Sequence, residues 1–147
     1  MTSDRAAQLQ AINSALAPEL DPACDYPALA AQAERWHEVR PLEGLRVLCG
    51  TPLFLNTLAQ FAALLAGGAD LAAVYSDELG YDPAIPDFLA GIGLAAYHGA
   101  NEAAACGPFD AVLDCSALNK QVPSRYGYCE LTRSGVHVYK SDRKSVV

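Results

Sequence analysis

Positive charge, cysteine motifs and long apolar runs are all scarce in this sequence. Ten lysines and arginines stand against 17 aspartates and glutamates, which gives a formal net charge of −7. Proteins that neutralise nucleic-acid phosphates need an excess of basic side chains, so the composition argues against a nucleic-acid partner. The five cysteines form no C-x-x-C pair, and the N-terminus has no basic segment followed by an apolar core. These two absences favour a cytoplasmic protein with reduced thiols.

The longest stretch without a charge runs from Val47 to Ala69, and polar residues and turn formers interrupt it. Gly50-Thr51-Pro52, Asn56 and Gln60 break the run, whereas a transmembrane helix needs about 20 consecutive apolar residues. A buried strand, a turn and a core-facing helix fit this stretch better, so we expect no membrane association. Histidines occur only at positions 37, 98 and 137. They are too far apart for a sequence-local metal motif, so no metal site is expected.

The sequence does contain enough apolar material for one domain. It has 147 residues, of which 52% are hydrophobic, and a chain of that length buries roughly 70% of its unfolded surface. We therefore expect a single domain over residues 1–147, with a core that needs neither disulfides nor a structural metal.

Charge is distributed unevenly along the chain. Residues 119–147 hold six lysines and arginines against two acidic residues, so the rest of the chain is strongly acidic. A basic segment on an acidic body can attract an anionic ligand or the body of a second copy, or it can simply be solvated. Together with an apolar N-terminal segment that has few charges, this pattern predicts a homodimer.

Hydrophobic spacing predicts two helices in residues 1–40, followed by alternating strands and helices. The N-terminal helices are expected at 6–16 and 28–39. Four short apolar strands are predicted at 45–49, 71–75, 94–97 and 111–115, with helices between them at 56–66, 86–90 and 101–105. Such strands, without a polar face, are typical of a parallel sheet covered on both sides. The predicted fold is α/β, with three layers, a mainly parallel sheet of the flavodoxin or Rossmann type, and an N-terminal helical segment.

Ligands of such folds bind beyond the carboxyl ends of the strands. The segments that follow the predicted strands are 50–57, 76–78, 98–101 and 114–118. Asn56 and Thr57 can contact a ligand or only cap the helix that follows them, and His98 can contact a ligand or be an exposed loop residue. The stretch Gly91–Ala96 has the spacing G-x-G-x-x-A, but a helix is expected before it and a strand after it. This order is the reverse of a dinucleotide site.

Three parts of the chain carry a resemblance to a known family. They are Pro41–Val47 with Asn56-Thr57 and Leu64–Leu71, then Val112-Leu113-Asp114, and finally Tyr128–His137, which ends in Gly-Val-His. In these parts the chain resembles the substrate domain of the S-adenosylhomocysteine hydrolases. The resemblance covers roughly residues 28–140 and implies a substrate-domain-like unit at 41–140.

The resemblance also implies which residues meet a substrate. Asn56 replaces a Gln or Glu that contacts the adenine edge in the family, while other positions match. The substrate-binding residues expected in the crevice are Thr51, Asn56, Thr57, Asp114 and Thr132. Glu130 is the expected acid or base and Cys115 the expected nucleophile. The residue type and position alone favour a buried, inert thiol at Cys115 instead, because the adjacent carboxylate raises rather than lowers its pKa.

Departures from the family pattern bear on activity. Pro52 and Phe54 replace a histidine and a threonine of the first loop, and Cys115 and Leu131 replace two catalytic carboxylates. Nothing in the sequence corresponds to the family's NAD-binding domain. We therefore expect a stand-alone domain without the parent hydrolase activity and without a cofactor, which binds or acts on a nucleoside-like or specialised metabolite. The alternative is a non-catalytic binding or accessory subunit of a partner enzyme, since the replacements make the crevice more apolar.

Overall fold

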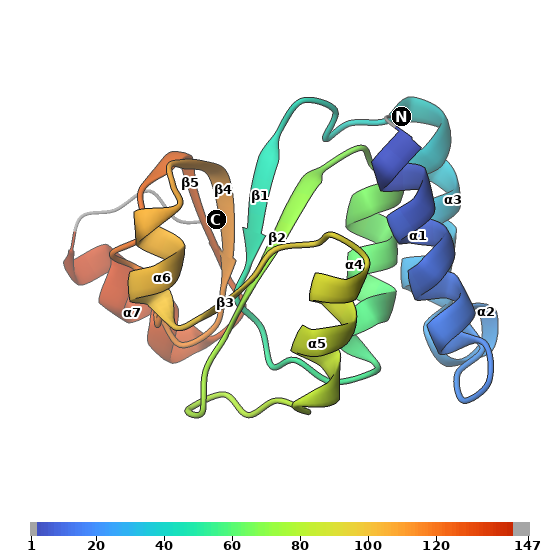
Figure 1. The fold of residues 1–147 in the computed structure, drawn as a ribbon. Helices are drawn as coiled ribbons and strands as arrows, with labels where there is room; N and C mark the ends of the chain where they lie inside the picture. The colour runs from blue at the N-terminus through green and yellow to red at the C-terminus, as the bar shows by residue number, and fades with distance from the viewer. Residues whose placement is uncertain (1–2, 143–147) are drawn as a thin grey trace.

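The computed structural model describes residues 3–142 and contains a five-stranded parallel sheet (Figure 1). Its strands are β1 (Arg46–Cys49), β2 (Asp70–Tyr75), β3 (Ala96–His98), β4 (Phe109–Asp114) and β5 (Ser124–Glu130). Their order is β3-β2-β1-β4-β5, and all neighbouring pairs are parallel. The predicted α/β fold with a flavodoxin-like parallel sheet is therefore confirmed.

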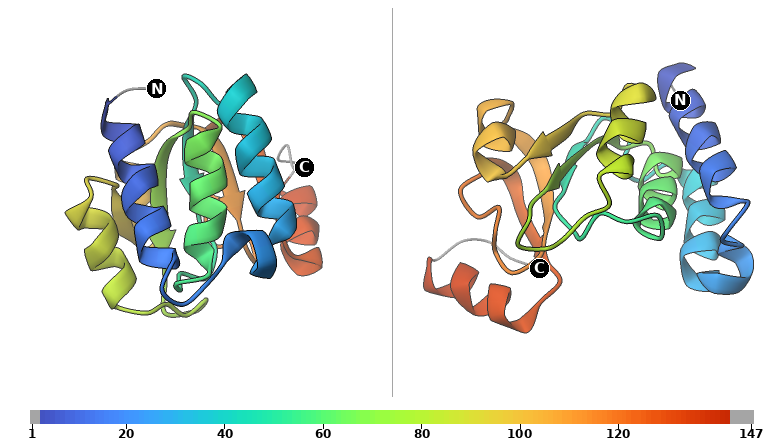
Figure 2. Two further views of the ribbon diagram at one scale, coloured as in Figure 1. Left: turned by 90° about the vertical axis from the view of Figure 1, so that its right-hand side faces the viewer. Right: turned by 60° about the horizontal axis from the view of Figure 1, so that its bottom comes forward.

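Helices cover both faces of this sheet. One face carries α4 (Thr57–Ala66) and α5 (Ala84–Gly91), and the other carries α6 (Ala100–Ala105) and α7 (Arg133–Ser141) (Figure 1). The N-terminal helices are α1 (Ser3–Leu16), the single turn α2 (Pro22–Asp25) and α3 (Pro27–Val39). Figure 2 shows α4 between α1 and α3, and both of these helices contact it.

Side-chain alternation along β1 shows why an apolar run predicts this strand. Val47 and Cys49 join the core beneath α1, α4 and α5, whereas Leu48 joins the core beneath α6 and α7. Successive side chains of a strand point to opposite faces. Because both faces are covered, the strand has no polar side, and the sequence is continuously apolar.

Three observed elements were not predicted from the sequence: α2, β5 and α7. In β5 the residues from Ser124 to Gly127 are exposed or half-buried, and Tyr128 and Glu130 are buried. This strand lies at the edge of the sheet, so it lacks the continuous apolar run of the central strands. The Gly91–Ala96 stretch does connect the end of α5 to the start of β3, as expected. Among residues 3–142, no helix is both long and apolar enough to cross a bilayer.

The chain changes direction across the sheet between β1 and β4. It runs outward from β1 to β2 and β3, then returns to the other side of β1 as β4. Such a switch point normally leaves a crevice at the carboxyl ends of the two strands. Here Asn119 fills the space beside Gly50, where an added Cβ would lie 2.3 Å from Asn119 Nδ2. A glycine is therefore required at position 50.

Candidate functional site

The loop after β1 and the residue after β5 border an open cavity of about 380 Å³, which we call the Phe54 cavity. Three predicted substrate-binding residues, Thr51, Asn56 and Thr57, line it together. The other lining residues are Leu29, Pro52, Phe54, Gln60 and Leu131. Phe54 and Leu131 are 42% and 57% exposed. The cavity is thus mainly apolar, with several polar groups on its wall.

Hydrogen bonds of Thr57 fix the shape of this loop. Its Oγ1 donates to the Pro52 carbonyl oxygen at 2.6 Å and accepts from the Phe54 N–H at 3.2 Å. Thr51 Oγ1 lies 3.5 Å from Gln60 Oε1, which links the loop to α4. The side chain of Asn56 is exposed and does not cap α4. Its amide therefore remains available to a ligand.

Asp114, by contrast, is buried, and its carboxylate is used within the protein. Oδ1 accepts from the Cys115 N–H and from Asn119 Nδ2, both at 2.8 Å. Oδ2 accepts from the Asn119 N–H at 3.0 Å and from the Tyr139 hydroxyl. Burial raises the pKa of Tyr139, and the bond to Asp114 raises it further, so the hydroxyl stays protonated. Asp114 thus joins the loop after β4 to α7.

Glu130 is also buried and accepts hydrogen bonds through both oxygens. Oε1 accepts from the Ser116 N–H at 3.0 Å and from Thr132 N–H and Oγ1, both at 2.7 Å. Oε2 accepts from the Ala117 N–H at 2.9 Å. Burial raises the pKa of Glu130, but these bonds outweigh burial, and the net pKa lies below the ordinary 4.5.

The bonds to Glu130 hold an unusual backbone in place. Ser116 and Ala117 have φ angles of 59° and 54°, which residues with a side chain seldom adopt. Gly135 packs against the same carboxylate, and an added Cβ there would lie 2.2 Å from Glu130 Cδ. Glu130 is therefore a brace between the loop after β4 and the start of α7.

The structure divides the predicted site residues into two groups. Thr51, Asn56 and Thr57 line the Phe54 cavity, whereas Asp114, Glu130 and Thr132 belong to a hydrogen-bonded network with partners from the same chain. Leu131 stands between Glu130 and Thr132 in the sequence and lines the Phe54 cavity. The network therefore lies beside this cavity.

Cys115 lies half-buried next to this network. Burial raises the pKa of its thiol, a hydrogen bond with Ser116 lowers it, and the Glu130 and Asp114 carboxylates raise it again. The net shift is upward, which favours the protonated thiol. The roles of Glu130 as acid or base and of Cys115 as nucleophile stay predictions.

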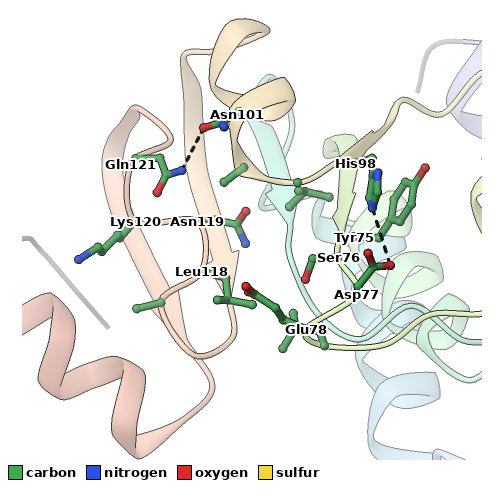
Figure 3. Close-up of a pocket in the computed structure, with 15 residues that line it drawn as sticks. Tyr75, Ser76, Asp77, Glu78, His98, Asn101, Leu118, Asn119, Lys120 and Gln121 are labelled. Atoms are coloured by element: carbon green, nitrogen blue, oxygen red, sulfur yellow. Dashed lines mark hydrogen bonds and ion pairs between the residues drawn. The ribbon is translucent and has the colours of Figure 1, made fainter.

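A second cavity, of about 570 Å³, lies at the carboxyl ends of β2 and β3 (Figure 3). We call it the Asn119 cavity. It is lined by residues 74–79, 98–101 and 117–121. The segments 76–78 and 98–101 were expected at this edge because they follow strands. Asn119 was not singled out, because the expected segment after β4 ended at Leu118.

Neither a cluster of metal ligands nor a match to a known protein assigns a role to these two cavities. Within residues 3–142, no three His, Cys, Asp or Glu side chains are grouped so that they could hold a metal ion. Neither a protein-family model nor a curated protein matches the sequence. The resemblance to the S-adenosylhomocysteine hydrolases therefore stays a prediction.

Proposed function

We propose that this protein binds a small molecule with a flat, mainly apolar body and one polar edge, of nucleoside-like size, in the Phe54 cavity. The observation that carries the proposal is the meeting of Thr51, Asn56 and Thr57 with the exposed apolar side chains of Phe54 and Leu131. Ligand pockets are commonly apolar with a few polar groups that orient the ligand. The volume of about 380 Å³ suits a small organic molecule.

The chemistry of the lining supports this ligand class. The Phe54 ring offers a face on which a planar group can stack. Gln60 Oε1 already accepts from Thr51 Oγ1, whereas Asn56 presents an amide, in which a donor stands beside an acceptor. That pairing complements the edge of a heterocycle such as adenine, which the resemblance also suggests for position 56.

The state of the carboxylates favours binding over acid–base catalysis. A general acid needs a proton to donate at the working pH, whereas the hydrogen bonds to Glu130 lower its pKa. Asp114 already accepts four hydrogen bonds within the protein. Both carboxylates are therefore already engaged within the protein, and hydrolysis of S-adenosylhomocysteine is not expected.

A second candidate function is the docking of a partner enzyme on the same surface. Its support is the exposure of Phe54 and Leu131, since large apolar side chains gathered at one place often mark interaction sites. Under this hypothesis the cavity receives an apolar side chain of the partner, and the protein acts as an accessory subunit.

Thermal-shift measurements with adenosine, S-adenosylhomocysteine and S-adenosylmethionine test the first candidate. A ligand that binds the folded state raises the unfolding midpoint by mass action, so we expect adenosine to raise it. Phe54→Ala should weaken adenosine binding by about 1 to 3 kcal/mol, the range for stacking on an aromatic side chain. Tyr126→Ala is the matched control, because Tyr126 is 60% exposed and does not line the cavity. No shift with any of the three probes, or an unchanged shift in Phe54→Ala, would contradict the proposal.

A further inference from the structure

We infer that the Asn119 cavity is a second binding site, one that takes a small hydroxylated amine of the amino-sugar type. This inference does not depend on the proposed function, because the two cavities share no lining residue. The helices beside them also differ. Residues of α3 and α4 line the Phe54 cavity, whereas the start of α6, on the opposite face of the sheet, lines this one.

Two polar atoms on the wall of this cavity have no hydrogen-bond partner within residues 3–142. Ser76 Oγ is the single buried side-chain nitrogen or oxygen atom without a hydrogen-bond partner in the described part of the chain. Asn119 is 3% exposed and donates through Nδ2 to Asp114, but its Oδ1 receives no hydrogen bond. Both residues border the open space in Figure 3. Native proteins rarely leave a buried hydroxyl unpaired, so Ser76 Oγ points to a ligand that completes it, and Asn119 Oδ1 lies on the wall of the same cavity.

The wall that carries Asn119 is held firmly in place. Asp114 accepts hydrogen bonds from both the backbone N–H and Nδ2 of Asn119. Glu130 accepts from the Ser116 and Ala117 N–H groups just before it. Asn119 Oδ1 therefore keeps one position, and a ligand donor that meets it loses little energy to reorganisation of the protein.

Two long donor side chains of the lining are already paired within the protein. Lys120 Nζ lies 3.1 Å from Asp142 Oδ2. Gln121 Nε2 donates to Asn101 Oδ1 at 3.3 Å, as the dashed line in Figure 3 shows. Donors that a ligand brings can therefore pair with Ser76 Oγ and Asn119 Oδ1 without displacing these two side chains.

The mouth of the cavity is acidic. Asp77 and Glu78 are exposed there. The His98 ring stacks on Tyr75 with centroids 5.0 Å apart, and its Nε2 lies 3.9 Å from Asp77 Oδ1. The two carboxylates attract an ammonium group and repel a phosphate or carboxylate. An amino group at the mouth and hydroxyl groups at Ser76 and Asn119 together define the ligand class.

Calorimetric titration with three related sugars, in a buffer free of amines, tests the inference on the complete chain. Glucosamine carries both an ammonium group and hydroxyls, N-acetylglucosamine lacks the charge, and glucosamine 6-phosphate adds a negative group. We expect saturable binding of glucosamine, weaker binding of N-acetylglucosamine, and the weakest binding of the phosphate. No saturable binding of glucosamine, or equal binding of the phosphate, would overturn the inference.

Two variants assign the binding to this cavity. Ser76→Ala should weaken glucosamine binding about three- to tenfold, the range of one hydrogen bond, while the unfolding midpoint stays the same or rises because an unpaired buried hydroxyl is removed. Asp77→Asn should weaken binding of glucosamine but not of N-acetylglucosamine. Glu34→Gln, an exposed carboxylate of α3, is the control. Unchanged glucosamine binding in both cavity variants would show that the sugar binds elsewhere and would overturn the inference. Phe54→Ala should leave glucosamine binding unaffected, whether or not this variant weakens adenosine binding.

Discussion

At the scale of single residues, Glu130 illustrates how a carboxylate at the end of a strand can serve the fold. The sequence suggested an acid or base, because the type and position of the residue fit a strand-end site. The structure adds four hydrogen bonds from Ser116, Ala117 and Thr132. No sequence pattern reveals the bonds from Ser116 and Ala117, because their donors are backbone N–H groups of a loop whose path depends on tertiary packing. Asn56 is the contrasting case. Its side chain is exposed and does not cap α4, so it remains available for the expected contact with a ligand.

We predict that Glu130→Gln lowers the free energy of unfolding at pH 7 by about 1.5 to 3 kcal/mol, the range for hydrogen bonds to a charged group. Glutamine presents an NH₂ group where the carboxylate now meets N–H donors, so part of the brace is lost. Urea denaturation of the variant and of Glu34→Gln, the exposed control, measures the effect. Equal stability of the two variants would show that the brace contributes nothing.

The same carboxylate predicts a pH dependence. Its pKa in the folded protein lies below the ordinary 4.5, so its stabilisation is present above that pH and is lost as the pH falls through the folded-state pKa. The stability difference between the wild type and Glu130→Gln should therefore be largest above about pH 5 and shrink in more acidic solution. Denaturation curves between pH 3 and pH 7 test this, and a difference that grows on acidification would contradict it.

At the scale of elements, predictability followed burial for four of the five strands, whereas the edge strand β3 (Ala96–His98) was predicted two residues early, at 94–97. The strands β1, β2 and β4 are covered on both faces, so their apolar runs stand out in the sequence. β5, at the sheet edge, mixes exposed Arg125 and Tyr126 with buried Tyr128 and Glu130. Its sequence therefore lacks a strong strand signal. The strand is stabilised by its parallel pairing with β4 and not by local strand propensity. The helix α7 was missed for a related reason, since Gly135 and Tyr139 are its buried residues and, apart from Val136 and Val138, its other residues are polar or charged.

We predict that the Tyr139 hydroxyl is a main link between α7 and the sheet. Tyr139→Phe keeps the ring that packs on Tyr128 with centroids 4.7 Å apart, but removes one donor to the buried Asp114. The expected loss is about 1 to 3 kcal/mol of stability, the cost of leaving a buried acceptor incompletely paired. Hydrogen exchange should show α7 amides losing more protection than those of α4, whereas Tyr126→Phe, on the exposed strand edge, should change neither. Uniform loss over both helices would contradict a local role.

At the scale of the whole molecule, the topology brings the two cavities to the same edge of the sheet. Because all five strands are parallel, the loops after β1, β2, β3 and β4 meet beyond their carboxyl ends. Asn119 occupies the switch point beside Gly50 and closes the position where a ligand of such folds is commonly held. The open space that remains lies near α3 and α4 on one face and near α6 on the other. The sequence could predict that a binding site lies at this edge of the sheet. It could not predict that the edge is divided into two cavities, because that division depends on the buried side-chain amide of Asn119.

The last prediction concerns assembly. Basic side chains of the C-terminal part, among them Arg125, Arg133 and Lys140, lie on β5 and α7, and residues 143–147 of the same basic segment fall outside the described residues. β5 is the last strand of the sheet in the order of the described strands, and a two-fold axis would repeat each contact between a basic and an acidic surface. We expect light scattering to give twice the chain mass of 15.5 kDa at low ionic strength. Charge reversal by Arg125→Glu should weaken the dimer. At about 0.5 M salt, where exposed charges are screened over a few ångströms, dissociation should increase.

A monomer under all conditions would refute the dimer, while a dimer indifferent to both salt and Arg125→Glu would show that apolar or backbone contacts hold the two chains together.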